Sequence, residues 1–380
     1  MRYKLLFALF ALFASCSQYK KRDLADASVP RIKVNPLDSQ TVYIEDISDD
    51  VYHVTLDTSA SFGISRITNF FSTDSNIIIS DRSQACIFIY DFNGKPKAKI
   101  NGSTVKGGKY TFMTDVIVDE AKSQIEVVDM TMSKIFRYNF AGKFIDSAVI
   151  TEPRYGGITF AKNKDLYVSE LLNNNPDKRR ISIYKSTGNR IDYVTQKLFL
   201  FPIIKGLDIG YPHQFDNYKD SLLYFPLLDD KIYAVTADDV KPAYQIEVPE
   251  ENRIGLDLMT EKAKDHFEYW KKMESGNIMY DNNSLFVNRD WVSFNYNFQS
   301  NKTSRTIFYS KRSGKVIQFV EFKSRVNPAF HLRSPVIGKR GEYFVMRTPY
   351  PYTEPLKQDE NKGQLKNRYV FMFLKLKTIS

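Results

Sequence analysis

The chain has 380 residues, of which 43% are hydrophobic and 14% aromatic, which is enough for a large folded core and too much for a disordered chain. Its formal net charge is +10, but the basic residues are dispersed, without the Lys/Arg stripe or base-stacking motif that nucleic-acid binding requires. Its two cysteines, Cys16 and Cys86, are too few for a disulfide framework or a cysteine metal site.

The first sixteen residues have the anatomy of a secretory signal. Arg2 and Lys4 form a basic head, an apolar run follows, and Ala14-Ser15-Cys16 is a small-residue cleavage site. The run is shorter than the roughly 20 residues of a transmembrane helix. Because FASC resembles a bacterial lipobox, residues 1–16 are predicted to be a lipoprotein signal peptide with Cys16 lipidated, and two acyl chains suffice for stable anchoring. The alternative is an ordinary signal peptide that happens to contain a cysteine.

Residues 17–40 are expected to form a tether, and Lys20, Lys21 and Arg22 lie near its start. Each basic residue adds about 1 kcal/mol of attraction beside an anionic membrane, although a merely soluble basic tail is equally compatible. The tether lacks an acidic run of the kind that surface-exported lipoproteins carry after the cysteine. It therefore favours a cell-envelope lipoprotein at the outer membrane facing the periplasm, with surface exposure as the alternative.

Internal repeats of 40 to 50 residues come next along the chain. Residues 76–100 read as a strand, an aspartate, a turn, an alternating strand, a tight turn and another strand, and the segment from residue 124 repeats this order. Tyr90, Tyr138 and Tyr184 occupy the same place in three successive units, with spacings of 48 and 46 residues. Such a period is typical of β-propeller blades.

Two kinds of turn residue recur in the repeats. Gly94 and Gly142 precede the outgoing strands, where a hairpin turn or its bulge requires a positive φ. Asp81 and Asp129 close the preceding strands, where a carboxylate can accept hydrogen bonds from backbone donors of the next turn. We therefore expect these aspartates to be structural.

Looser units from residues 221, 284 and 342 bring the count to six. The last unit lacks a fourth strand, and an alternating strand at residues 51–59 precedes the first unit. We expect that strand to complete the last blade and close the ring, which removes exposed strand edges. The predicted fold is thus all-β, a six-bladed β-propeller formed by residues 41–380 as a single domain.

Two segments interrupt the strand pattern. At residues 257–274, apolar residues at helical spacing predict one inserted amphipathic helix, either a lid on the rim or an apolar face that receives a partner. The polar segment from Thr353 to Asn367 is expected to be an exposed loop.

Residues 40–380 resemble the six-bladed, NHL- and TolB-like β-propeller lipoproteins of Gram-negative bacteria. The resemblance rests on the repeated strand-Asp-strand-YDxxGK pattern, the leading VYHVTLDTS strand and GGKY at 107–110. In that family a glycine-rich segment ends in Gly-Glu-Tyr, whereas Lys109 stands here in place of the acidic residue. The resemblance implies the fold more than the function, because propellers host many unrelated activities.

Catalytic motifs are missing from the sequence, including the GxSxG elbow, HExxH and the P-loop, so no catalytic residue, metal or cofactor is predicted. Inner strands of a propeller converge on an axial pocket, the default ligand site of a ring-shaped fold. The residues near the starts of the expected inner strands are candidate ligand-binding residues at the channel mouth: Arg66, Asp115, Tyr155, His213, His331 and Arg333. The alternative is that they are ordinary solvated loop residues.

The function favoured by the sequence is a non-enzymatic, monomeric binding module of the cell envelope. It would bind a protein, peptide or glycan at the channel mouth or rim loops, and the arginines and histidines among the candidates favour an anionic ligand over a cation. The alternative is a propeller hydrolase or lyase, lactonase-like, with an axial cation held by carboxylates and amides. A signalling partner that senses the state of the envelope cannot be separated from the binding module by sequence.

Overall fold

A computed structural model describes residues 29–38, 41–58, 60–104, 108–152, 157–171, 179–199, 214–226, 229–253, 271, 276–298, 300–327, 330–348 and 369–378. The lipidation residue Cys16, most of the predicted tether, all of the predicted helix but Lys271, and the loop from Thr353 to Asn367 lie outside them. In the described part of the chain, no helix is long and apolar enough to cross a membrane.

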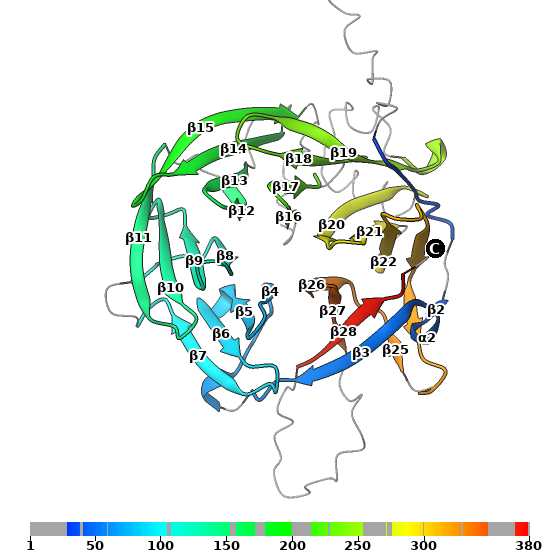
Figure 1. Cartoon of the computed structure of the whole chain (residues 1–380), viewed down its shortest axis with the longest axis horizontal. Coiled ribbons are helices and arrows are strands. Elements are labelled where there is room, and N and C mark those ends of the chain that lie inside the picture. Colours follow the sequence, from blue (N-terminus) through cyan, green and yellow to red (C-terminus); the bar gives the residue numbers. More distant parts are fainter. Residues whose placement is uncertain are drawn as a thin grey trace, which may run out of the picture.

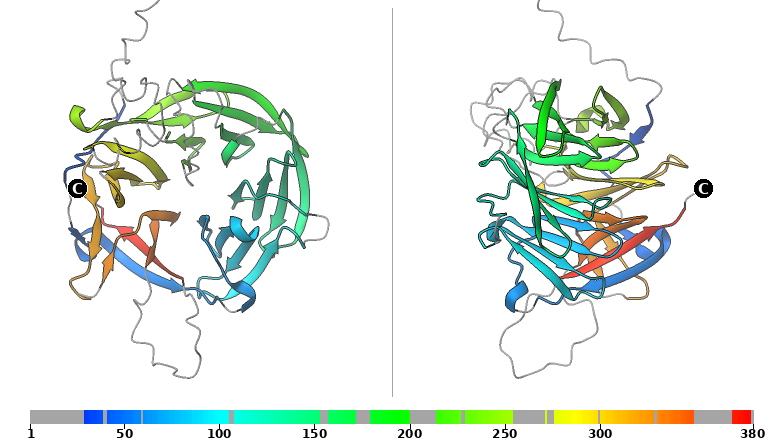
Figure 2. Two further views of the ribbon diagram at one scale, coloured as in Figure 1. Left: turned by 180° about the vertical axis from the view of Figure 1, so that it is seen from behind. Right: turned by 60° about the vertical axis from the view of Figure 1, so that its left-hand side comes forward.

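The described strands form mainly antiparallel sheets arranged as a ring around a central space, which is a β-propeller (Figure 1). The first sheet contains β4 (Asn69–Ser72), β5 (Ile77–Asp81), β6 (Cys86–Tyr90) and β7 (Pro96–Asn101). In each group of four strands the first lies nearest the centre, and the last lies on the outside, as the view from behind in Figure 2 also shows.

The next eight strands share one sheet. They are β8 (Asp115–Asp119), β9 (Gln124–Asp129), β10 (Lys134–Asn139), β11 (Phe144–Ile150), β12 (Gly157–Asn163), β13 (Leu166–Leu171), β14 (Arg179–Ser186) and β15 (Arg190–Phe199). Each set of four is an antiparallel meander, and the outer strands β11 and β15 pair in parallel, with Val149 opposite Arg190 and Ile150 opposite Ile191. The pairing joins two groups of strands at the rim.

Three further groups continue the ring. They are β16 (Phe215–Tyr218) to β19 (Val240–Glu247) through β17 (Ser221–Tyr224) and β18 (Lys231–Val235); β20 (Met279–Val287), β21 (Trp291–Phe298), β22 (Ser300–Ser310) and β23 (Val316–Phe319); and β26 (Val336–Arg340), β27 (Tyr343–Thr348) and β28 (Val370–Leu376) with β3 (Ser48–Thr55). Strand β3 pairs antiparallel with β28 over its whole length, from Thr55 opposite Val370 to Ser48 opposite Leu376.

Short elements from the N-terminal part of the chain reinforce the rim. Strand β1 (Arg31–Lys33) pairs in parallel with β19, and β2 (Thr41–Tyr43) pairs with β24 (Glu321–Lys323), which pairs in turn with β25 (His331–Leu332). A four-residue helix, α2 (Ile44–Ile47), joins β2 to β3, and single 3-10 turns occupy Ala60–Phe62, Arg82–Gln84 and Glu250–Asn252.

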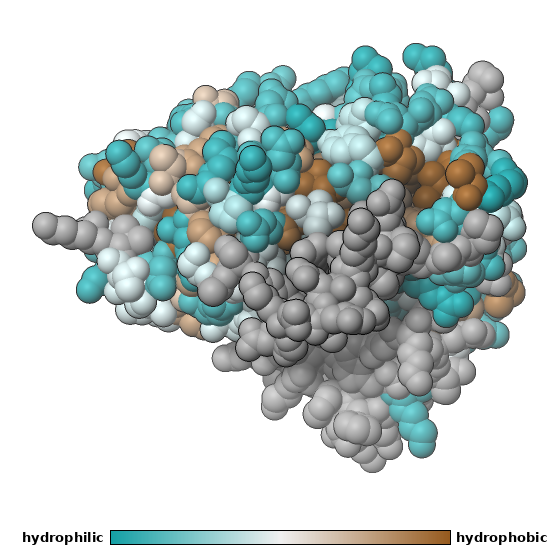
Figure 3. All heavy atoms as spheres, turned by 90° about the horizontal axis from the view of Figure 1, so that it is seen from below, coloured by the Kyte–Doolittle hydropathy of each residue, from teal (hydrophilic) through white to brown (hydrophobic). Residues whose placement is uncertain are grey.

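The core lies between neighbouring sheets, because the alternating strands bury one face against each adjacent group. Phe70 of β4, Phe88 of β6 and Phe371 of β28, for example, share one apolar cluster. Cys86 is buried, as expected of a small apolar residue, and burial raises the pKa of its thiol. On the face drawn in Figure 3, apolar residues are interspersed with hydrophilic ones.

The recurring aspartates brace two loops each, which confirms that they are structural. Asp129 accepts hydrogen bonds from the backbone N–H groups of Thr111, Phe112, Thr131 and Met132 at 2.7 to 3.1 Å. Asp81 does the same in the preceding repeat. Although burial alone would raise the pKa of Asp129, these hydrogen bonds hold it below its usual range.

The turn glycine of the first repeat is also required by its surroundings. Gly94 has a φ of +75°, and a Cβ there would lie 1.9 Å from the carbonyl oxygen of Thr55 in β3. The N–H of Asp57 donates to the Gly94 carbonyl at 2.8 Å, so this turn rests directly on the end of β3. The repeat turns and the N-terminal strand are therefore fitted to each other.

Candidate functional site

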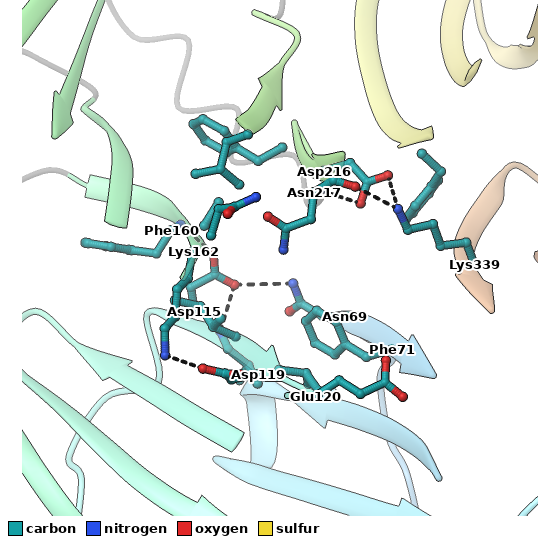
Figure 4. Close-up of a pocket in the computed structure, with 18 of the residues that line it drawn as sticks. Asn69, Phe71, Asp115, Asp119, Glu120, Phe160, Lys162, Asp216, Asn217 and Lys339 are labelled. Carbon is teal, nitrogen blue, oxygen red and sulfur yellow. Dashed lines mark hydrogen bonds and ion pairs between the residues drawn. The ribbon is translucent and has the colours of Figure 1, made fainter. Parts of the chain in front are cut away.

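The strands nearest the centre enclose an axial cavity of about 430 Å³. Among the described residues, its wall draws on six of these strands, namely β4, β8, β12, β16, β20 and β26 (Figure 4). The volume falls in the range of roughly 300 to 1,000 Å³ that is usual for small-molecule sites.

Asp115, the first residue of β8, bridges three of the wall strands. Its Oδ1 accepts from the Asn69 side chain of β4 at 3.3 Å, and its Oδ2 accepts from the backbone N–H of Phe160 in β12 at 2.7 Å. Burial raises the pKa of Asp115 to about 6, although these donors favour the ionised form. A carboxyl group in such a position stiffens the wall whether or not it also meets a ligand.

Asp216 plays the same part on the opposite side of the cavity. Its Oδ2 lies 2.6 Å from Lys339 Nζ of β26 and also accepts from the backbone N–H of Val287 in β20. Burial raises the pKa of Asp216, and Lys339 offsets part of that effect. Asp115 and Asp216 therefore each receive a backbone hydrogen bond from the inner strand of the next group along the chain.

Lys162 belongs to a buried network beneath the wall. Its Nζ lies 2.6 Å from Asp119 Oδ2 and 2.5 Å from Glu126 Oε1, and the Tyr167 hydroxyl donates to Glu126 Oε2 at 2.8 Å. Although burial disfavours a charged amine, Glu126 and its neighbours hold the pKa of Lys162 above its usual range. The network joins β8 and β9 to β12 and β13.

Neutral polar groups complete the lining. The side-chain amide of Asn217 points into the cavity in Figure 4, and its only hydrogen bonds in the described part of the chain are made by its backbone. Thr159 and Gln214 line the same cavity, but Thr159 Oγ1 and Gln214 Oε1 are buried and have no partner among the described residues. Each of these two atoms exposes less than 1 Å² of surface and so does not face the open cavity, whereas the Asn217 side chain is exposed to it.

The candidates predicted from the sequence are not all brought to this cavity. Asp115 lines it, whereas the exposed Arg66 does not, and the Arg66 backbone N–H is bound to Asp81. Tyr155 and His213 lie outside the described residues.

His331 and Arg333 were expected at the start of an innermost strand, but that place belongs to β26. His331 lies in β25, on the three-stranded sheet with β24 and β2, and both residues contact Glu321, at 3.2 and 3.3 Å. The reason is an extra hairpin, β24–β25, held by the buried Phe322 and Leu332 between β23 and β26. A binding role for the pair stays a prediction.

Sequence reasoning missed Lys162, Asp216, Asn217 and Lys339. Asp216 and Asn217 belong to the inner strand FDNY, which precedes the degenerate unit recognised from residue 221. Had that unit been extended backwards by one strand, its acidic residue would have aligned with the start of β8. Lys162 and Lys339 carry no local signal, since their partners lie 36 to 123 residues away.

A second cavity, of about 650 Å³, lies at the outer rim between β1, β19 and β23. Gln318 spans it, donating to the carbonyls of Asn35 and Asp38 at 2.6 Å each. Among the described residues, no group of three or more His, Cys, Asp or Glu side chains is arranged to hold a metal ion.

The family model for a domain of unknown function, DUF4934, matches residues 29–377. The chain belongs to this family. A search of curated proteins finds no match to this DUF4934 sequence.

Solved structures similar to this DUF4934 protein support its fold. A Bacteroides fragilis protein described as exported is 14% identical, with a TM-score of 0.67 over 92% of this chain and 100% of its own. A member of the DUF4221 family from Bacteroides vulgatus is 12% identical, with a TM-score of 0.53 over 87% and 98%. Streptogramin B lyase, 11% identical over 86% and 98%, has a TM-score of 0.42, too low to bear on function.

Proposed function

We propose that this protein is a non-enzymatic binding module that holds a small polar ligand in its axial cavity. The observation that carries the proposal is a cavity of small-molecule size among six inner strands, into which the Asn217 amide points without a side-chain partner in the described part of the chain. A wall braced by Asp115 and Asp216 holds the cavity open before the ligand arrives, which lowers the cost of ordering on binding.

The proposal includes a six-bladed ring closed by the N-terminal strand. Four-stranded meanders begin at β4, β8, β12, β16 and β20, and β26–β28 gain a fourth strand from β3. This arrangement supports closure, because β3 precedes the first meander and β28 is the last strand of the described chain, so their pairing joins the two ends of the ring.

The cavity itself is tested by filling it. Asn217→Trp places a large side chain in the cavity at a position whose own side chain has no described partner, and Asn93→Trp adds the same residue to an exposed turn. Thermal-shift screening with a library of small polar compounds is expected to find stabilisers of the wild type and Asn93→Trp that fail with Asn217→Trp. Equal stabilisation of all three proteins would contradict an axial site.

We further propose that the protein is anchored in the cell envelope through Cys16, with its ring facing the periplasm. The lipobox-like FASC sequence and the basic residues that follow it support the anchor. In a Gram-negative host, radiolabelled palmitate should enter the wild type but not Cys16→Ala, and only the wild type should need detergent for release from membranes. Labelling of Cys16→Ala would remove the anchor from the proposal.

One observation favours the hydrolase or lyase alternative. Asp115 is buried in the cavity with its pKa raised to about 6, and carboxyl groups perturbed in this way are often catalytic. Both of its oxygens, however, already accept hydrogen bonds from the wall. Once a ligand is known, Asp115→Asn decides: a binding module keeps the ligand intact in both proteins, whereas turnover lost in the variant favours the enzyme.

A further inference from the structure

One part of the axial cavity is formed by the turns that join β12 to β13 and β16 to β17, and we call it the β16 end. Lys164 occupies the first turn and Lys219 the second, and both residues line the cavity. The Asn163 side chain ties the two turns together, because it donates to the carbonyl oxygens of Lys219 and Ser221 at 3.2 and 3.1 Å. These contacts hold the backbone from which the Lys219 side chain extends.

Lys219 is a cation that the protein leaves available. The residue is exposed, its ammonium group has no carboxylate partner in the described part of the chain, and it lies 5.2 Å from the centroid of the Tyr218 ring. Lys164, by contrast, pairs with Asp220 at 2.7 Å. Because that pair neutralises the acidic residue next to Lys219 in the turn, Lys219 keeps its charge for a ligand.

Two further amines lie near Lys219. Lys311 Nζ is 3.6 Å from the centroid of the same Tyr218 ring, and Lys339 Nζ is bound to Asp216 of β16. Burial, and then the positive charges of Lys339 and Lys219, lower the pKa of Lys311 to about 8. Neighbouring ammonium groups disfavour one another's charged form, so an anion bound among them would be stabilised by all three.

The carboxylates of the cavity do not cancel this charge. The two that act on Lys311, Asp216 and Asp290, are each paired with another cation, Lys339 at 2.6 Å and Arg289 at 3.2 Å. The other acidic residues of the lining belong to β8 and the turn that follows it, away from the β16 end in Figure 4: Asp115, Asp119 and Glu120. The β16 end is therefore locally positive.

The backbone at position 219 does not require a lysine. Lys219 has a φ of +55° and Lys164 a φ of +54°, a left-handed conformation that glycine adopts more readily than residues with a Cβ. In the turn between β26 and β27, the residue with a positive φ is Gly341. Unfavourable backbone conformations cluster at ligand sites, and a lysine in this one fits a role in binding better than a role in folding.

We propose that the β16 end of the axial cavity binds the anionic group, carboxylate or phosphate, of a small ligand. Lys219 contacts that group, and Asn217 beside it contacts the rest of the ligand. This inference rests on the proposed function and narrows it to the charge of the ligand. The sequence led to the same charge from different residues, Arg66, His331 and Arg333, none of which lines the cavity.

Isothermal titration at low ionic strength tests the sign of the charge with compounds that share one ring. The anionic probes are glucuronate and the phosphate ester of glucose, with acetate and inorganic phosphate as the bare groups. Glucose is the neutral probe and glucosamine the cationic one. At least one anionic probe is expected to bind the wild type about tenfold more tightly than glucose or glucosamine, and to weaken as salt is added.

Two variants of Lys219 locate the site. Lys219→Gln keeps the length of the side chain and removes its charge, whereas Lys219→Gly also suits the positive φ and should leave the urea midpoint of unfolding unchanged. Both should weaken the anion about tenfold. Lys143→Gln is the matched control, because it removes the same charge from an exposed outer turn and should leave the affinity unchanged.

The results that overturn the inference differ from those that overturn the proposed function. Anion binding that is equal in the wild type and Lys219→Gln, or glucose bound as tightly as every anionic probe, overturns this inference alone. So does a neutral or cationic compound that stabilises the wild type and not Asn217→Trp when no anion binds. The absence of any ligand in either experiment overturns both.

Discussion

Replacing Lys162 by methionine probes the buried network beneath the cavity wall. The Lys162 side chain is 4% exposed, that of Glu126 is fully buried, and their charged atoms lie 2.5 Å apart. Methionine keeps most of the side-chain volume but removes the ammonium group, which leaves Glu126 and Asp119 without their shared cation. Breaking a buried pair in this way costs about 3 to 5 kcal/mol.

The remaining partners of Glu126 place the expected loss at the lower end of that range. Tyr167 still donates to Glu126 at 2.8 Å, and Arg137 Nε lies 3.5 Å from it. We therefore expect Lys162→Met to lower the free energy of unfolding by about 3 kcal/mol. Adding Glu126→Gln should recover a large part of the loss, because the uncompensated charge is then gone.

Urea unfolding at pH 7, followed by circular dichroism, measures the effect as a shift in midpoint at constant slope. Lys164→Met is the matched control, since Lys164 forms an ion pair of similar length, 2.7 Å, with Asp220, but the two side chains are 73% and 86% exposed. The control should lose little or nothing. Equal losses for the two lysine variants would refute the argument that burial, and not distance, decides the energy.

Three other predictions concern stability. Gly94→Ala should cost at least twice as much as Gly188→Ala, as measured by urea unfolding, because both have a φ near +70° but only the first would collide with β3. Asp129→Ala should cost about 4 kcal/mol by the same measurement, since four backbone donors lose their acceptor, and a loss no larger than that of Asp91→Ala in an exposed turn would contradict the brace. As the pH rises from 4 to 6, the wild type should lose about 2 kcal/mol of stability relative to Asp115→Asn, because a carboxyl group whose pKa is raised to about 6 binds its proton more tightly in the folded state; the opposite slope would mean that the hydrogen bonds to Asp115 outweigh burial.

The sequence predicted best where the structure depends on local turn chemistry. Gly94 and Gly142 adopt the expected positive φ, and each strand that leads into them has a register shift beside the recurring tyrosine, between Ile89 and Tyr90 and between Arg137 and Tyr138. These signals lie within a few residues of one another. A reader of the sequence can therefore find the repeats without knowing any tertiary contact.

The cavity could not be found in the same way. The inner strands that line it are only four to nine residues long and carry no turn signature, and the contacts that give them meaning are distant. Asp216 acquires its role from Lys339, 123 residues later, and His331 lost its expected place because the hairpin β24–β25 intervenes before β26. The sequence shows that acidic and basic residues are present, but it does not show which of them contact each other in the folded chain.

The parallel pairing of β11 with β15 connects two adjacent groups of strands more firmly than other neighbouring groups are connected. Elsewhere around the described ring, neighbouring groups of strands meet mainly through side chains, but here two groups share a ladder, reinforced by hydrogen bonds from the N–H groups of Val149 and Thr151. We expect these eight strands to open together as one cooperative unit in amide hydrogen exchange. Any opening that admits a molecule to the axis should then come from the other groups of strands, β16 to β28 with β3 and β4 to β7.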